Sequence, residues 1–257
     1  MLVFILNLFI APIILILLLI IPKFIISFFE RPKLKRTWTS LHENLPTISF
    51  TENDLVFIKN IRNAKYFKSE WDNKVSWENK KYKLSEVKNL NLYVNPYAFL
   101  QSHVIVEFEF LEGASICISY EIRKTHPEKF KIYKVLYENY ESYYCVSVPE
   151  DILYVRKNIR KSKLFKFEIN CSKEKTIELL KLLADDINIY SKKPFFYRIL
   201  YRNCISQILN KMNAVGILNF SNKLSFLNVL KIIYKNSENI SHEKKMNFKK
   251  FLRAHQY

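Results

Sequence analysis

The stretch SHVIVEFEFLEGASICISYEIR, residues 102–123, contains two strand patterns and the turn between them. Apolar and polar residues alternate along residues 104–110 and again along residues 116–122. This period of two is typical of strands that bury one face. The five residues between the two runs include Gly113, one of only two glycines in the chain. The stretch therefore predicts an antiparallel hairpin.

The apolar face of this hairpin fixes its register, because a slip of one residue would turn every side chain to the other face. Even-numbered residues form the apolar face of both strands, so even-numbered residues must pair with each other. His103 and Glu121 then lie on the opposite face, near the open end of the hairpin. A carboxylate beside an imidazole holds its tautomer and stabilises its charged form.

The rest of the soluble part predicts a single α+β domain, with an antiparallel sheet packed on helices and no internal repeat. The sequence divides into an anchor at residues 1–29, a linker at 30–53 and a domain at 54–257. Residues 131–144 are rich in aromatics and give no clear pattern. Further strands are expected at residues 54–64, 71–84, 90–94 and 164–169, and helices at residues 172–190, 203–212 and 224–234.

Residues 2–22 are apolar apart from Asn7 and predict a transmembrane helix, since about 20 such residues span a bilayer. No lysine or arginine precedes this run and no A-x-A-like site follows it, so an uncleaved anchor is favoured over a signal peptide. Four basic residues come next and form a collar that the positive-inside rule would place in the cytoplasm. They are Arg31, Lys33, Lys35 and Arg36.

The composition narrows the classes of function. The formal net charge is +17, which fits contact with anionic lipid head groups or a compositional drift toward lysine. No G-x-G-x-x-G, P-loop or nucleic-acid motif occurs, so neither a nucleotide cofactor nor a nucleic-acid partner is expected. The four cysteines form no C-x-x-C pair, which argues against a zinc site and favours buried free thiols over disulfides.

Cys204 is the candidate nucleophile. Asn203 is a good N-cap, which would put Cys204 at the first position of a helix. A helix N-terminus favours the thiolate and lowers its pKa, and a neighbouring histidine would lower it further. Its backbone N–H groups would also help to hold an oxyanion. The plainer alternatives are a cysteine in the core, a structural histidine, and a Glu121 that pairs with Arg123 or Lys124.

These residues also carry a family resemblance. The chain resembles the Lnb N-terminal periplasmic domain family over roughly residues 54–215, with similar motifs in the same order. The matching segments are residues 60–63 (NIRN), 77–78 (WE), 82–84 (YKL), 102–103 (SH), 118–124 (ISYEIRK), Tyr197 and 203–204 (NC).

The resemblance implies a permuted papain-like (NlpC-type) fold and thiol acyl chemistry, including lipoprotein N-acyl transfer. It implies Cys204 as nucleophile, His103 as base and Glu121 as the residue that orients the base. The chain departs from the family at three places. Ser102 stands where alanine is common, Val104 where threonine is usual, and residues 205–206 (IS) where two threonines often follow the cysteine.

The sequence therefore predicts a membrane-anchored, cysteine-dependent acyltransferase or acyl hydrolase that works through a thioester. Its expected partners are membrane lipid and an acyl-bearing substrate, either a phospholipid or a lipoprotein. The predicted anchor makes it a single-pass protein of the inner membrane, and the family resemblance implies a periplasmic domain, in conflict with the basic collar. Two other functions stay open: a thiol protease or amidase acting on peptide or peptidoglycan, and a non-enzymatic membrane protein with a degenerate site.

Overall fold

The computed structural model describes most of the chain between residues 28 and 220. The described residues are Leu18, Ile21, Pro22, Ile25, Ile26 and residues 28–98, 101–125 and 139–220. The predicted helix at 224–234 and most of the predicted anchor lie outside this set. Within it, no helix combines the length and the apolar character needed to cross a membrane.

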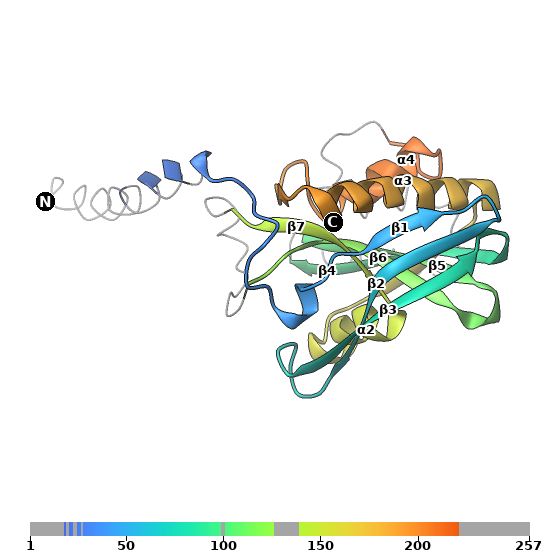
Figure 1. Cartoon of the computed structure of the whole chain (residues 1–257), viewed down its shortest axis with the longest axis horizontal. Coiled ribbons are helices and arrows are strands. Elements are labelled where there is room, and N and C mark those ends of the chain that lie inside the picture. Colours follow the sequence, from blue (N-terminus) through green and yellow to red (C-terminus); the bar gives the residue numbers. More distant parts are fainter. Residues whose placement is uncertain are drawn as a thin grey trace, which may run out of the picture.

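A large, mostly antiparallel sheet forms the centre of the molecule (Figure 1). Its strands follow the order β1-β2-β7-β6-β5-β4-β8, with β3 paired to β2 and β9 paired to β7. The exception to antiparallel pairing is β2 with β7, which run parallel. The strands are β1 (Thr47–Phe50), β2 (Leu55–Tyr66), β3 (Asn73–Lys83), β4 (Val87–Ala98), β5 (Gln101–Phe110), β6 (Ser115–Ile122), β7 (Glu141–Ser147), β8 (Phe165–Ile169) and β9 (Phe195–Phe196).

The predicted hairpin is formed by β5 and β6, and its predicted register is confirmed. Val106 pairs with Ile118, and Glu107 pairs with Cys117, so even-numbered residues face even-numbered ones. The short 3-10 helix η3 (Leu111–Gly113) closes the turn, with Gly113 at a positive φ of 76° that a side chain would strain. The hairpin continues outward into β4 and β7, so it lies in the middle of the sheet.

Helices cover both faces of this sheet. Helix α3 (Lys173–Lys192) and helix α4 (Ser206–Ala214) pack on one face, and α2 (Pro149–Tyr154) with the π-helix η5 (Val155–Ile159) lies on the other (Figure 1). The predicted cap of α3 is confirmed, since the Ser172 hydroxyl accepts from the N–H of Lys175. Two further 3-10 turns are η1 (Ser40–His42) and η2 (Leu84–Glu86).

Each face of the sheet has its own core. The larger core lies under α3 and α4 and includes Val106, Ile118 and Tyr120. The smaller one lies under α2 and includes Tyr93, Ile105, Cys117, Tyr143, Cys145 and Ile152. Because both faces are buried, polar side chains on the α2 face must find partners inside the protein.

The structure also extends the predicted elements. The expected short run at 90–94 is part of the long strand β4, and the region without a clear pattern ends in the first four residues of β7. Residues 47–50 fall within the predicted linker but form β1, which pairs with β2 at the edge of the sheet. Four residues are too few to show a convincing alternation, which is why the sequence did not predict this strand.

Candidate functional site

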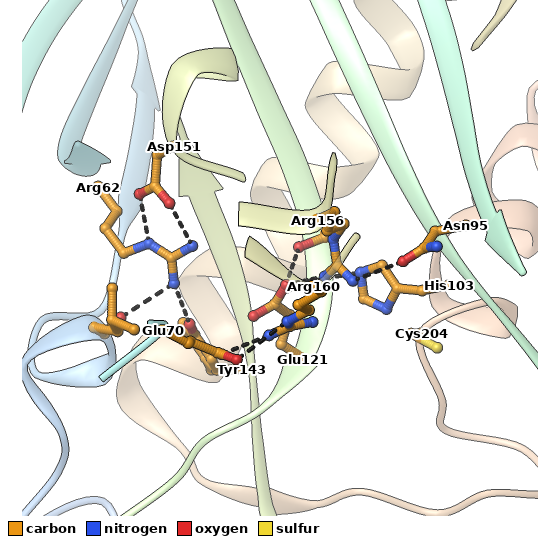
Figure 2. A network of polar contacts seen from close by, with 12 residues as sticks. Arg62, Glu70, Asn95, His103, Glu121, Tyr143, Asp151, Arg156, Arg160 and Cys204 are labelled. Carbon is orange, nitrogen blue, oxygen red and sulfur yellow. Dashed lines mark hydrogen bonds and ion pairs between the residues drawn. The ribbon is translucent and has the colours of Figure 1, made fainter. Parts of the chain in front are cut away.

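A row of polar side chains crosses four neighbouring strands on the α2 face. Asn95 in β4 pairs with His103 in β5, and Glu121 in β6 pairs with Tyr143 in β7. The register of the hairpin brings the two inner residues together, with Nε2 of His103 3.7 Å from Oε1 of Glu121. The structure therefore places this histidine beside this carboxylate, as the register predicted (Figure 2).

Arg156, which the sequence did not single out, joins this row from η5. Its Nη2 donates to Oε1 of Glu121 at 2.8 Å, and its Nη1 donates to Oδ1 of Asn95 at 3.4 Å. The arginine that pairs with Glu121 is thus Arg156, since Arg123 instead donates to the backbone carbonyls of Leu34, His42 and Glu43. Arg156 lies in the basic run of residues 156–161, which by itself is typical of a solvated surface.

The charges of the row follow from burial and from Arg156. Burial, aided by the positive charge of Arg156, lowers the pKa of His103 well below 6.5, although Glu121 opposes this shift. Burial alone would raise the pKa of Glu121, but Arg156, Arg62 and His103 hold it well below its usual value. At neutral pH the site therefore contains an ionised carboxylate, a cationic guanidinium and a neutral imidazole.

Cys204 lies in the turn just before α4, which begins at Ser206, so it does not occupy the first helical position that was expected. Oδ1 of Asn203 accepts from the N–H groups of Ile205 and Ser206, both at 2.9 Å, and this contact caps the turn that leads into the helix. The N–H of Cys204 donates to the hydroxyl of Tyr197 at 3.3 Å. These bonds occupy the first backbone N–H groups of the turn, so the expected backbone oxyanion hole is not free in this conformation.

The pKa of the Cys204 thiol differs from the expectation. The helix start was expected to lower it, but burial raises it above 9.0, even though the Tyr197 hydroxyl and the charge of Arg156 act in the opposite direction. The side chain is only 6% exposed and belongs to the larger core. The site therefore rests with a neutral thiol and a neutral imidazole, rather than with a thiolate–imidazolium pair.

The thiol and the imidazole meet at the beginning of β5. The sulfur of Cys204 donates to the carbonyl of Ser102 at 3.5 Å and accepts from the Tyr197 hydroxyl at 3.5 Å. Ser102 immediately precedes His103, so the sulfur lies beside the histidine. In Figure 2 the imidazole stands between Glu121 and Cys204, with one nitrogen toward each. Buried Nε2, on the Glu121 side, has no hydrogen-bond partner among the described residues.

A second buried network positions the helix that carries Arg156. Arg62 of β2 donates to both oxygens of Asp151 in α2, at 2.8 and 3.1 Å. Asp151 also accepts from the N–H of Ala64 and from the hydroxyl of Tyr66. Arg62 reaches the Tyr143 hydroxyl at the end of the polar row. This network fastens α2 to the sheet, and the π-helix η5 follows directly.

Two further features of the site region concern ligands. Among the residues that the structure describes, no group of three or more histidine, cysteine or acidic side chains is placed to hold a metal ion. A cavity of about 510 Å³ opens on the α2 side, lined by residues that include Tyr93, Leu153, Tyr154, Lys157 and Leu164. None of Cys204, His103 or Glu121 lines it.

The comparison with known proteins identifies the family. Residues 73–236 match the model of the Lnb N-terminal periplasmic domain, which is well over half of the chain. The chain belongs to this family, and membership implies a periplasmic location for the globular part. The matched range contains His103, Glu121 and Cys204. It begins after residues 60–63, so the NIRN motif lies outside it and does not support the family assignment. No curated protein and no solved structure matches the chain.

Proposed function

We propose that this protein is a membrane-anchored, cysteine-dependent acyltransferase or acyl hydrolase with a permuted papain-like domain. One observation carries the proposal: His103 stands between the Glu121 carboxylate and the Cys204 thiol, inside the protein. A nucleophile, a base and a group that orients the base are the three parts of a thiol acyl-transfer site.

In the first half-reaction, Cys204 attacks the carbonyl carbon of an acyl ester. Because Nε2 of His103 faces Glu121, Nδ1 is the nitrogen that takes the thiol proton. The S–C bond forms, the ester C–O bond breaks, and the imidazolium returns its proton to the departing alcohol. The product is an acyl thioester on Cys204. The Tyr197 hydroxyl, which already donates to the sulfur, is a donor beside the nucleophile for the developing oxyanion.

In the second half-reaction, an amine or water accepts the acyl group. His103 removes a proton from the acceptor as the new bond to carbon forms, and the thioester C–S bond breaks. Glu121 stabilises the imidazolium in both halves, while Arg156 keeps that carboxylate ionised. An amine acceptor makes the protein a transferase, and water makes it a hydrolase.

Membrane lipid is the proposed source of the acyl group, either as a phospholipid or as a lipoprotein. The family membership, the predicted anchor at residues 1–29 and the net charge of +17 support this choice. The anchor would keep the site at the bilayer surface, where such substrates reside.

The test is covalent labelling of the full chain with an activated fatty acyl ester, followed by mass spectrometry of the intact protein. We expect one acyl group on the wild type and none on Cys204→Ala. Cys171→Ala is the matched control, because Cys171 is the partly exposed cysteine among the four, and this variant should label as the wild type does. Labelling that persists in Cys204→Ala would refute the proposal.

The same material separates the other functions. Faster turnover of a peptide amide than of a lipid ester would make the protein a thiol amidase. An unlabelled wild type that turns over neither substrate would favour a non-enzymatic role for the site.

A further inference from the structure

The turn at residues 198–202, which leads directly into Asn203 and Cys204, presents two large apolar side chains to solvent. Leu200 is 59% exposed and Tyr201 is 61% exposed. Tyr197, Asn203 and Cys204, on either side of the turn, are buried. An exposed apolar pair beside a buried site indicates a surface that meets a partner.

This turn is built to hold its tip outward. The N–H of Arg198 donates to the carbonyl of Arg202, and the N–H of Arg202 donates back to Arg198, both at 2.9 Å. The side chain of Asn203 donates to the carbonyl of Ile199 at 2.7 Å. These hydrogen bonds close the turn, and the side chains of Leu200 and Tyr201 are left exposed at its tip.

The turn is connected to the segment that leaves the predicted anchor. Nη1 of Arg198 donates to Oδ1 of Asn139 at 2.8 Å, and Nδ2 of Asn139 donates to Oε2 of Glu30 at 3.0 Å. Glu30 directly follows Phe28 and Phe29, which are 80% and 77% exposed. The two apolar pairs therefore lie at the same end of the domain, where the chain from the N-terminal helical residues reaches β7 (Figure 1).

Cations surround the apolar tip. The guanidinium of Arg202 lies 4.8 Å from the ring centre of Phe195, and that of Arg198 lies 5.1 Å from that of Phe196. Nζ of Lys193 lies 5.7 Å from the ring centre of Phe195. Apolar and aromatic tips flanked by arginine and lysine complement the acyl chains and anionic head groups of a bilayer surface.

We propose that the turn at residues 198–202 inserts Leu200 and Tyr201 into the surface of an anionic phospholipid bilayer, beside the anchor. For its consequence this inference rests on the proposed function: docking here brings the sulfur of Cys204, three residues beyond Tyr201, to the acyl groups of that bilayer. The docking itself needs no chemistry at Cys204, so an experiment can refute either proposal while the other still holds.

The experiment uses the full chain in vesicles of phosphatidylglycerol and phosphatidylcholine whose acyl chains carry bromine, which quenches tryptophan on contact. Tyr201→Trp places a reporter at the turn. Tyr154→Trp is the matched control, because Tyr154 is also an exposed tyrosine, at 43%, but lies in α2 on the other side of the sheet. The unsubstituted protein, with its 3 tryptophans, supplies the background to subtract.

We expect the fluorescence added by Tyr201→Trp to be quenched at least about twofold more than that added by Tyr154→Trp, as an interfacial position requires. Quenching should weaken when phosphatidylcholine replaces phosphatidylglycerol. Equal quenching at both positions, no quenching at 201, or indifference to the head group would each overturn the proposal.

The same measurement on Tyr201→Trp combined with Cys204→Ala separates the two proposals. Quenching that persists there shows docking without acyl chemistry. An acyl adduct on the wild type without quenching at 201 would retain the proposed function and reject the docking.

Discussion

At the residue scale, Arg156 determines the charge state of the candidate site. It is buried and contacts Glu121 directly, so removing its charge changes the pKa of both His103 and Glu121. Its positive charge lowers the pKa of His103, and the ionised Glu121 raises it. Arg156 acts through these two residues, and so it is a positioning residue rather than a catalytic one.

Arg156→Gln should therefore move the pH dependence of catalysis. Without the guanidinium, the effect of the Glu121 carboxylate on His103 is no longer opposed by Arg156, and the imidazole pKa rises. The base must be neutral to accept the thiol proton, so the acid limb of kcat/KM should shift to higher pH. The measurement is kcat/KM against pH with the activated acyl ester.

Two variants control for this effect. Arg156→Lys keeps the charge and should leave the acid limb close to that of the wild type. Arg160→Gln removes a cation that lowers the pKa of His103 less and pairs mainly with Glu70, so its shift should be smaller. An acid limb that stays in place in Arg156→Gln, with the fold intact by circular dichroism, would contradict this account.

At the element scale, the start of α4 links stability to the position of the nucleophile. Asn203→Ala removes the cap bonds to Ile205 and Ser206, and such a loss costs about 0.5–2 kcal/mol. Because Cys204 belongs to the capped turn, labelling at its sulfur should slow as well. Urea denaturation and the rate of acylation measure the two effects.

Ser172→Ala is the matched variant, since it removes a cap of the same kind from α3. It should lower the free energy of unfolding by a similar amount while leaving the acylation rate unchanged. If both variants slowed acylation equally, the effect would come from general stability, and the special role of the α4 cap would be rejected.

The elements also show how far the sequence could predict the site. The hairpin register and the caps at Ser172 and Asn203 followed from local pattern, because alternation and capping act over a few residues. The position of Arg156 depends on the Arg62–Asp151 pair, whose partners are 89 residues apart, and no local pattern encodes it. The pKa of Cys204 was predicted in the wrong direction, because the burial that raises it comes from packing across the sheet.

At the scale of the whole molecule, buried neutral histidines make stability depend on pH. Burial, with the charge of Arg62, lowers the pKa of His42 to about 3. In the unfolded chain the pKa is near 6.5, so below that pH the unfolded state binds a proton that the folded state does not. The free energy of unfolding should therefore fall as the pH drops below 6.5, by up to about 1.4 kcal/mol per pH unit for each such histidine.

Carboxylates add a second decline in stronger acid. The pKa of Glu70 is lowered to about 2, because the Arg160 and Lys124 charges outweigh its burial. The stabilisation that Glu70 contributes is present above about pH 4.5 and is lost as the pH falls toward 2.

Urea denaturation from pH 7.5 to 4 tests the effect of the histidines. His42→Asn should flatten the dependence of the free energy of unfolding on pH between pH 6.5 and 5. An unchanged slope in that variant would contradict the assignment.

The close packing around Cys204 also affects how readily its thiol is oxidised. Oxidation of a cysteine proceeds through its thiolate and requires that an oxidant reach the sulfur. A protonated sulfur that is only 6% exposed meets neither condition at rest. Outside the cytoplasm, where thiols are readily oxidised, the same packing thus protects the Cys204 thiol from oxidation.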